Sequence, residues 1–415
     1  MLSSSFLEMR NRNAVRIMQS VRDQPGLSRA DIARICDLAK STVSSVVDEL
    51  VQGSILQETG SKTSSRGRRP VGLIFNPASR MAVGISLDHN RTEIVLCNLD
   101  GIVRAVRAKK HSGKNNLLSI SSTVLSDLQK LLAEQKLNRE EIGGIGLAVP
   151  GPLSKDRVSS NNEVKTGYEN LRQQLRQEMN CPVLIDSNTN MAALAESRLG
   201  AARESEEALV VRMGHEVRTA LVIDHKLLKG AQGRAGELGH LKVPGNDSIC
   251  QCGKRGCINS VAALDAIVSR CLAKGTAVED VDEVITAAAQ GDGKCVQALA
   301  DAGRAVGYGI ASCINILAPA DVIVTGRLVA AGKLLLDPLH EAIREFANAG
   351  NLANTNLVFD DSQNYVEAIG ASLAALLQDD FLLNLYLATA PKSAVRRRWR
   401  QIESEDTVTL HEAAR

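Results

Sequence analysis

A hairpin pattern occurs twice in the body of the chain, and it limits the folds that are open to it. In residues 81–99 two apolar runs flank the polar letters DHNR, and residues 207–230 contain a second pair of apolar runs. Each pair is followed by helical periodicity, so a β-β-then-α unit is indicated near 81–150 and again near 207–275. We therefore expect two similar lobes, each built on a central sheet.

Further strands and helices alternate around these units. Strands are predicted in GGIGLAVPGPL (143–153), CPVLIDSN (181–188) and PADVIVTGRL (319–328), and long helices at 117–136, 296–318 and 366–390. The chain has 415 residues, which is too long for one ordinary core and indicates two or three domains. Aromatic residues make up only 2% of it, so the cores must be aliphatic.

The composition argues against secretion and against membrane insertion. The N-terminal letters MLSSSFLEMRNRN lack the apolar core of a signal peptide. The longest uncharged run, between Arg304 and Asp321, is too short to span a bilayer comfortably and is predicted to be a buried helix. Of nine cysteines, six are scattered in apolar contexts and are expected to be packing residues: Cys36, Cys97, Cys181, Cys271, Cys295 and Cys313. This is no disulfide framework, so a cytoplasmic chain is expected.

The N-terminal block has the features of a nucleic-acid reader. Residues 1–76 hold 11 Lys and Arg against 7 Asp and Glu, a net charge of +4. Helical spacing in 11–23 is followed by a short helix that Ser28 caps, with SRAD approximating a capping box. A third helix begins in STVSS, where a second serine cap is expected. Three short helices with a tight turn before the third are typical of a helix-turn-helix, although a generic three-helix bundle is an alternative.

The third helix would place small polar donors and one cation against the base edges of the major groove. The letters ILQETG and VGLIFN are predicted to be two strands of a wing, joined by the basic segment SSRGRRP. Extended arginine-rich arms of this kind follow the narrow minor groove of DNA. The candidate DNA-binding residues are Ser28, Arg29, Lys40, Ser41, Thr42, Ser44, Ser45, Arg66, Arg68 and Arg69.

Three cysteines cluster close to one histidine. One imidazole and three thiolates suit tetrahedral zinc, and the candidate ligands are His240, Cys250, Cys252 and Cys257. The spacing is tighter than in ordinary zinc fingers, but Gly253 and Gly256 let the loop fold back. Three free cysteines brought together by chance are the alternative. Four protein ligands leave no open position, so the metal is expected to be structural and to fix His240, whose other ring nitrogen would face a cleft.

The order of these motifs resembles the ROK family, whose members are bacterial repressors and sugar kinases. The matching letters are RGRRP, GLAVPG, DSNTNMAALAE, GAQGRAGELGH and CQCGKRGC, spread over residues 10–390, while STVSS and GRRPVGLIFN resemble the xylose-repressor branch. The resemblance implies an α/β two-lobed, actin/hexokinase-like body with a sugar in its cleft. This body would follow a winged helix-turn-helix domain and would carry a structural zinc on the four ligands named above.

Kinases of this family need three parts that this chain lacks. In the first phosphate hairpin, G-x-D-x-G-G-T, the acid is replaced by Ser86 and the glycine pair by Asp88 and His89. In the second, G-T-G-I-G-G-G, only Gly214 remains. The catalytic Asp of N-D-A-N aligns with Asn188, and a neutral amide cannot accept a proton. We therefore predict that the chain is not an enzyme and needs no ATP.

The residues that align with the family's sugar contacts form the candidate effector site: Ser187, Asn188, Glu237, His240 and Asn259. Two carboxylates have become amides there, and the letters VRMGHEVR bring Arg212, His215 and Arg218 toward the same cleft. Fewer acids and more bases favour an anion, so a sugar phosphate is expected ahead of a neutral sugar. A decayed pocket that binds nothing is the alternative.

Together these features predict a cytoplasmic transcriptional regulator, a repressor of sugar-metabolism genes that is controlled by a sugar or sugar phosphate. Its expected partners are a double-stranded DNA operator and a second copy of itself, in a homodimer or homotetramer. The predicted domains are 1–76 (winged helix-turn-helix), 77–390 (two-lobed sugar-binding and dimerisation domain) and 391–415 (a disordered tail, basic then acidic). There are two alternatives. One is an ATP-dependent sugar kinase, and the other is a regulator controlled by a protein partner that docks on RRRWR at 396–400.

Overall fold

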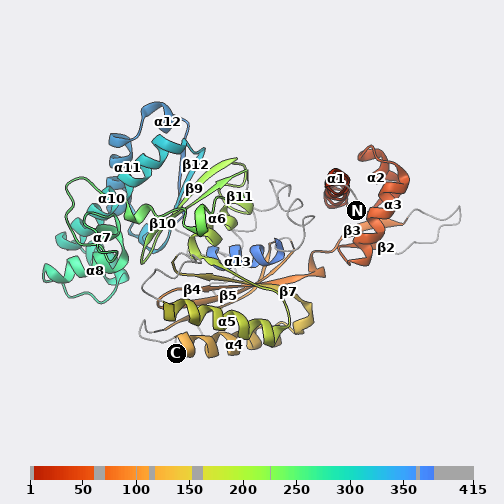
Figure 1. Ribbon diagram of the computed structural model, residues 1–415, viewed down its shortest axis with the longest axis horizontal. Helices are drawn as coiled ribbons and strands as arrows, with labels where there is room; N and C mark the ends of the chain where they lie inside the picture. The colour runs from red at the N-terminus through yellow and green to blue at the C-terminus, as the bar shows by residue number, and fades with distance from the viewer. Residues whose placement is uncertain are drawn as a thin grey trace.

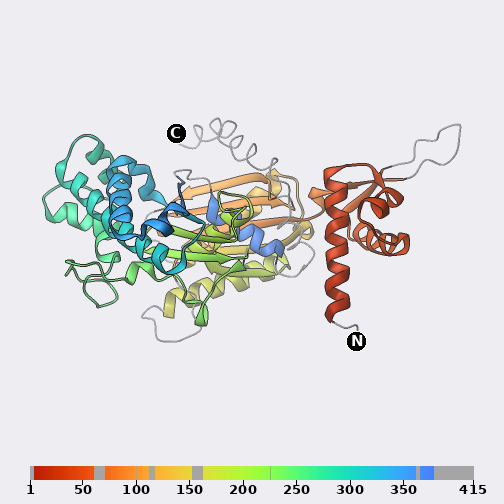
Figure 2. The same ribbon diagram turned by 90° about the horizontal axis from the view of Figure 1, so that it is seen from above.

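The computed structural model describes residues 4–59, 71–99, 101–111, 117–151, 162–224, 226–360 and 365–377. The chain forms a small N-terminal module, which lies at one end of the molecule, and two larger lobes (Figures 1 and 2). Every helix within the described ranges is too short or too polar to cross a bilayer. The predicted basic arm (Arg66, Arg68 and Arg69) and the predicted tail at 391–415 lie outside the described residues.

The N-terminal module contains the three predicted helices and the two predicted strands. Its elements are α1 (Ser4–Asp23), β1 (Leu27–Ser28), α2 (Arg29–Ile35), α3 (Lys40–Gln52), β2 (Leu56–Thr59) and β3 (Gly72–Phe75). The strands form an antiparallel sheet in the order β1-β3-β2. The aliphatic residues Ile17, Ile32, Val43 and Val47 are fully buried in its core. The helix α1 is longer than expected, and the two-residue strand β1 was too short to be predicted from periodicity.

The serine cap of α2 is confirmed, whereas the serine cap of α3 is wrong. The Ser28 hydroxyl accepts a hydrogen bond from the Asp31 amide at 3.2 Å, and the Asp31 carboxylate accepts one from the Ser28 amide at 3.1 Å. This reciprocal pair is a capping box. The helix α3 instead begins at Lys40, with Ala39 at the N-cap and no side-chain cap bond. Ser41 therefore lies inside the first turn, with its side chain exposed.

The first lobe is a five-stranded sheet in the order β6-β5-β4-β7-β8. Its strands are β4 (Met81–Leu87), β5 (Arg91–Asn98), β6 (Val103–Lys110), β7 (Ile142–Val149) and β8 (Val183–Ser187). The first three form an antiparallel meander, and β7 and β8 run parallel to β4. The helices α4 (Leu117–Glu134) and α5 (Asn162–Met179) cover one face of this sheet (Figure 1).

The second lobe repeats this topology. Its sheet has the order β11-β10-β9-β12-β13, with an antiparallel meander of β9 to β11 and with β12 and β13 parallel to β9. The strands are β9 (Glu207–Met213), β10 (Val217–Ile223), β11 (Lys226–Leu227), β12 (Asp321–Thr325) and β13 (Asn356–Phe359). The expectation of two similar lobes is thus confirmed.

Helices complete the second lobe on the face that lies away from the first. They are α7 (Asn259–Ala262), α8 (Leu264–Ala273), α9 (Val281–Ala289), α10 (Gly293–Leu317), α11 (Lys333–Phe346) and α12 (Ala349–Ala353). Leu299 on α10 and Leu339 on α11 are fully buried in one aliphatic core with Val211 and Val324 of the sheet. The uncharged run between Arg304 and Asp321 therefore contributes to a buried helix, as predicted.

Two helices, α6 (Asn188–Arg198) and α13 (Val366–Leu377), lie between the two sheets (Figure 1). Glycine allows this close packing, because a Cβ atom at Gly84 or Gly146 would overlap the backbone carbonyl groups of α13. A Cβ atom at Gly370 would likewise overlap the Met191 carbonyl group of α6. The packing brings the end of β4 in the first lobe close to the β9–β10 hairpin of the second, where the candidate site lies.

Candidate metal centre and interlobe cleft

The four predicted metal ligands lie together beside the second lobe. The ligand atoms of His240, Cys250, Cys252 and Cys257 are all within 4.8 Å of one another. The loop reverses at Gly253 and Gly256, whose φ angles of 83° and 84° are in the left-handed region that favours glycine. The role that the sequence predicted for these two glycines is therefore visible in the backbone.

The spacing of the sulfur atoms suits zinc and excludes a disulfide. Cys252 Sγ lies 3.8 Å from Cys257 Sγ, and Cys250 Sγ lies 3.8 Å from His240 Nδ1. A tetrahedral site with Zn–S bonds of about 2.3 Å places its sulfurs about 3.8 Å apart. A disulfide would need about 2.05 Å. The nine cysteines, all within the described ranges, are free thiols, so the donor set and its spacing fit a closed tetrahedral zinc site.

His240 connects this cluster to the cleft. Its Nδ1 atom faces Cys250, while its Nε2 atom lies 3.8 Å from Glu237 Oε2. One ring nitrogen is thus available to a metal, and the other faces a predicted effector residue. The orientation agrees with the division of roles that the sequence predicted for this imidazole.

The loop at 236–240 is pressed against the strand β10. The Thr219 amide donates to the Gly236 carbonyl at 2.9 Å, and a Cβ atom at Gly236 would overlap the Thr219 carbonyl. Asn259 is buried behind this loop, where its Oδ1 atom accepts a hydrogen bond from the Val217 amide at 2.8 Å. This amide oxygen is already used within the protein, so Asn259 supports the loop and the strand.

Glu237 has one carboxylate oxygen in use and one without a partner. Its Oε2 atom accepts a hydrogen bond from Arg218 Nη1 at 3.0 Å. Its Oε1 atom is buried and has no hydrogen-bond partner among the described residues. Arg218, whose side chain is 8% exposed, comes from β10 and also lies 3.7 Å from Glu216. The arginine therefore fixes the direction of the carboxylate and leaves one acceptor free.

Asn188 has a similar arrangement at the start of α6. Its Nδ2 atom donates to the Leu87 carbonyl at 3.0 Å, and Asn188 as a whole is only 3% exposed. Because a carbonyl can only accept, the amide nitrogen must face Leu87, and this fixes the orientation of the amide. The Oδ1 atom then lies on the other side, buried and without a partner among the described residues. The neighbouring Ser187 is buried and caps α6, since its hydroxyl accepts from the Asn190 amide at 3.2 Å.

The three bases that were expected to attract an anion already have carboxylate neighbours. Arg212 binds Asp88 and Glu367 at 2.7 Å each, and His215 Nδ1 lies 3.2 Å from Asp265 Oδ1. The third base, Arg218, is held by Glu237 as described above. The expectation of an anionic effector is therefore not supported, because these pairs offset the positive charge on which it depended.

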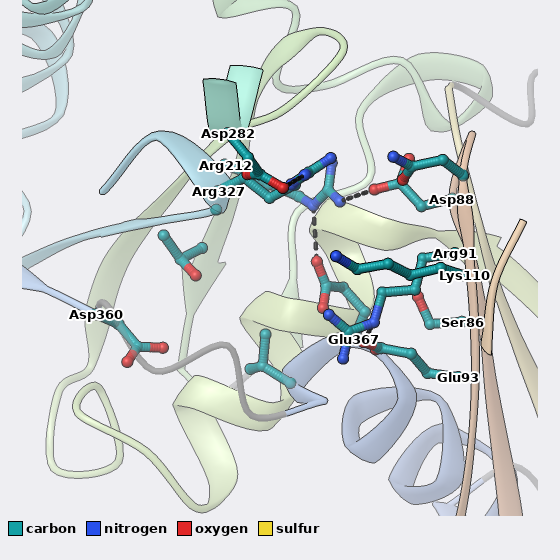
Figure 3. A pocket seen from close by; sticks show the side chains of 14 residues that line it. Ser86, Asp88, Arg91, Glu93, Lys110, Arg212, Asp282, Arg327, Asp360 and Glu367 are labelled. Carbon is teal, nitrogen blue, oxygen red and sulfur yellow. Dashed lines mark hydrogen bonds and ion pairs between the residues drawn. The ribbon is translucent and has the colours of Figure 1, made fainter. Parts of the chain in front are cut away.

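A cavity of about 100 Å³ lies between the lobes (Figure 3). All three arginines that line it have carboxylate partners: Arg91 with Glu93, Arg212 with Asp88, and Arg327 with Asp282. No local sequence pattern points to the partner Glu367, because it lies 155 residues from Arg212 in the chain.

The candidate DNA contacts on α3 are accessible, but two candidates near α2 have other roles. Lys40, Ser41 and Ser45 are exposed, and Thr42 and Ser44 are half-buried. Ser28 is 6% exposed and its hydroxyl is used in the capping box, so its side chain is not available to DNA. Arg29 is held by Asp48 at 2.7 Å and by Glu58 at 2.6 Å. The Ser28 hydroxyl and the Arg29 guanidinium group thus already have partners within the module.

Comparisons with known proteins cover nearly the whole chain. Residues 82–379 match the model of the ROK family. The xylose repressor of Caldicellulosiruptor bescii is 29% identical over 386 residues, which are 88% of this chain and 96% of that protein. The DNA-binding transcriptional dual regulator NagC of Escherichia coli (strain K12) is 25% identical over 364 residues, 84% of this chain and 88% of that protein.

Two solved structures share the fold. A ROK family transcriptional regulator, a homologue of the E. coli MLC protein, superposes with a TM-score of 0.71 at 22% identity and covers 92% of this chain and 97% of its own. A ROK hexokinase from Thermus thermophilus has a TM-score of 0.57 at 25% identity and covers 72% of this chain and 100% of its own. The hexokinase thus matches a smaller share of this chain than the regulator does.

Proposed function

The chain belongs to the ROK family and has its actin/hexokinase-like fold, and from this premise we propose that it is a sugar-responsive transcriptional repressor. Its curated relatives are named as a xylose repressor and as a transcriptional regulator, and the similarity covers most of their length. The genes under its control are those of sugar metabolism, in keeping with the names of these relatives.

The observation that carries the effector class is the pair of buried acceptors without partners, Glu237 Oε1 and Asn188 Oδ1. Buried polar atoms in native proteins are nearly always hydrogen-bonded, so both atoms need a donor. A sugar and a sugar phosphate both offer hydroxyl donors. The neutral sugar is favoured because Arg212, His215 and Arg218 already have carboxylate neighbours, which offset the attraction for a phosphate group. The effector is therefore a neutral sugar, with one hydroxyl on each acceptor and with His240 Nε2 beside the Glu237 carboxylate.

The cleft does not transfer phosphate in this proposal. A general base must accept the proton of the sugar hydroxyl, and Asn188 carries a neutral amide at the position that aligns with this base. Asp88 and His89 occupy the turn between β4 and β5, where the family's kinases have a glycine pair that lets backbone amides approach the phosphates.

The N-terminal module is the DNA-binding domain, a winged helix-turn-helix with α3 as its recognition helix. Lys40, Ser41 and Ser45 would face the base edges, with Thr42 and Ser44 beside them, and β2 and β3 would form the wing. The repressor acts as a homodimer or homotetramer, because two recognition helices are needed to bind two half-sites about one helical turn apart.

Zinc would be held by His240, Cys250, Cys252 and Cys257 and would be structural. When bound, the ion fixes the four side chains in one arrangement and has no open position for a substrate. The consequence for the cleft is that the His240 ring is held with its Nε2 atom toward Glu237.

Titration calorimetry with the full-length protein tests the effector class. D-xylose, D-glucose, N-acetylglucosamine and their phosphates would be compared, using an operator selected by the protein from a random DNA library. We expect a neutral sugar to bind and to release the operator, and Glu237→Gln to weaken this binding at least ten-fold. Glu279→Gln, an exposed change away from the cleft, is the matched control. If a sugar phosphate binds more tightly than its neutral sugar and releases the operator, the neutral-sugar assignment is refuted. If the protein selects no operator from the library, the repressor function is refuted.

A further inference from the structure

Arg212 crosses from the second lobe to the first. It lies on β9, its Nε atom donates to Glu367 Oε1 at 2.7 Å, and its Nη2 atom donates to Asp88 Oδ2 at 2.7 Å (Figure 3). Asp88 follows β4 in the first lobe, and Glu367 lies in the first turn of α13, which packs on the sheet of that lobe. One guanidinium group thus binds two separate elements on the far side of the cleft.

The charges in this bridge stabilise one another. Burial opposes the charge of Arg212, but Asp88 and Glu367 outweigh it and raise the pKa of the guanidinium. Burial would also raise the pKa of Asp88, but Arg212, His89 and His215 together outweigh burial and hold that pKa well below its usual range. The Arg212 side chain is 13% exposed, so removing one partner would leave a poorly solvated charge behind. The bridge is therefore costly to break.

A second contact joins the same two turns. The rings of His89 and His215 stack with their centroids 3.8 Å apart, one from each lobe. Asp88 lies next to His89 and Asp265 next to His215, so a carboxylate flanks the stack on either side. The two hairpin turns are thus held together by their side chains.

The bridge is linked to both free acceptors of the proposed effector site. On the first lobe, Asp88 follows Leu87, whose carbonyl holds the Asn188 amide. On the second lobe, Arg212 is directly opposite Arg218 in the β9–β10 ladder, and Arg218 holds Glu237. The Arg212 bridge therefore sets how far apart the two acceptors lie.

We propose that Arg212 is a positioning residue, an interlobe strut that holds the two halves of the effector cleft at the separation at which one sugar reaches both. It acts through Asp88 and Glu367 and does not itself contact the ligand. The role in sugar binding rests on the proposed function, whereas the role in holding the lobes together does not.

Hydrogen exchange of the ligand-free, full-length protein tests the strut. Arg212→Gln is compared with Arg270→Gln, which breaks an ion pair of 2.5 Å with Asp301 inside the second lobe. We expect amides in residues 84–98 and 210–223 to exchange at least ten-fold faster in the first variant only. Arg212→Lys, which can keep one of the two bonds, should be intermediate. Equal protection in the two glutamine variants would overturn the proposal. If Arg212→Gln does not fold, Asp88→Asn removes half of the bridge and must show the same faster exchange.

A titration with D-xylose, D-glucose and N-acetylglucosamine then tests the positioning role. For a sugar that the wild type binds, Arg212→Gln should raise the Kd at least ten-fold while Arg270→Gln leaves it unchanged. An unchanged Kd in Arg212→Gln would overturn the positioning role. If the wild type binds none of these sugars, the neutral-sugar function fails, and the exchange measurement alone decides whether Arg212 is a strut.

Discussion

Arg212 and Arg218 stand directly opposite one another on β9 and β10, yet their guanidinium groups bind different carboxylates. Like charges in directly opposed positions destabilise an antiparallel pair. Here Arg212 binds acids of the first lobe, while Arg218 binds Glu237 beside the metal centre. The acids of the cleft thus stabilise the second sheet as well as shaping the candidate effector site.

Replacing Arg218 by Met should weaken sugar binding about ten-fold. The change removes the hydrogen bond that directs Glu237 and leaves this carboxylate free to rotate toward His240. A ten-fold loss of affinity corresponds to about 1.4 kcal/mol of binding free energy. Calorimetry measures the effect, and Arg218→Lys should restore part of the affinity because an ammonium can still pair with Glu237. Operator binding without sugar should stay at the wild-type level, since Arg218 lies outside the DNA-binding module. Full affinity in the Met variant would contradict the role.

Changing Asn188 to Asp should destabilise the protein by about 1–3 kcal/mol without creating a kinase. The carboxylate would face the Leu87 carbonyl, so two acceptors would meet where a hydrogen bond of 3.0 Å now lies. Urea unfolding measures the destabilisation, with Gln174→Glu, an exposed change from a neutral to an acidic side chain, as the comparison. ATP turnover with a sugar panel should remain at background, because the changed phosphate turns stay in place. Measurable turnover would show that the cleft is still competent for phosphotransfer.

Cys252→Ser should lose the metal, because a serine hydroxyl does not replace a thiolate ligand of zinc. We expect the variant to lose its response to sugar before it loses its fold, since the metal mainly fixes His240. Metal analysis by mass spectrometry and operator release by sugar are the measurements. Cys313→Ser, a thiol away from the cluster, should keep one zinc per chain and a normal response. Wild-type protein without zinc would remove the hypothesis.

The basic arm and the third helix should affect DNA binding in different ways. Changing Arg66, Arg68 and Arg69 to Ala should weaken binding to every sequence. It should also reduce the slope of log K against log salt by about one for each phosphate that the arm no longer neutralises. Changing Thr42 or Ser44 should instead alter base preference. Fluorescence anisotropy over a range of salt concentrations separates the two effects. An unchanged slope in the triple variant would show that the arm does not bind phosphates.

The stability of the protein should fall as the pH rises from about 4.5 to about 7. Burial raises the pKa of Glu196 on α6 from 4.5 to about 7, so within this window the folded chain holds a proton that the unfolded chain releases. Glu196→Gln removes this term and keeps an acceptor for the Ala201 amide. As the pH rises from 5 to 8, the free energy of unfolding of the variant should increase by ~3 kcal/mol relative to that of the wild type, as measured by urea unfolding. Glu178→Gln, an exposed change, should show no such gain.

The sequence by itself determined the elements and the four candidate metal ligands, because both depend on local order. Apolar runs on either side of polar letters predicted both hairpins, and their repetition predicted two similar lobes, since the same pattern folds in the same way twice. The four candidate ligands lie within 18 residues, from His240 to Cys257, and glycines at 253 and 256 allow the turn that brings them together. The cap at Ser28 followed from an acid three residues later.

Only the tertiary structure decided which charges meet across the cleft. The sequence placed Arg212 and Arg218 near a ligand and predicted an anion, but it could not show that Asp88 and Glu367 neutralise the first and Glu237 the second. These partners lie 124, 155 and 19 residues away in the chain. Whether a buried charge attracts a ligand depends on its neighbours within a few ångströms. The packing of α6 and α13 between the sheets brings Asp88 and Glu367 to Arg212, and the loop at 236–240 brings Glu237 to Arg218.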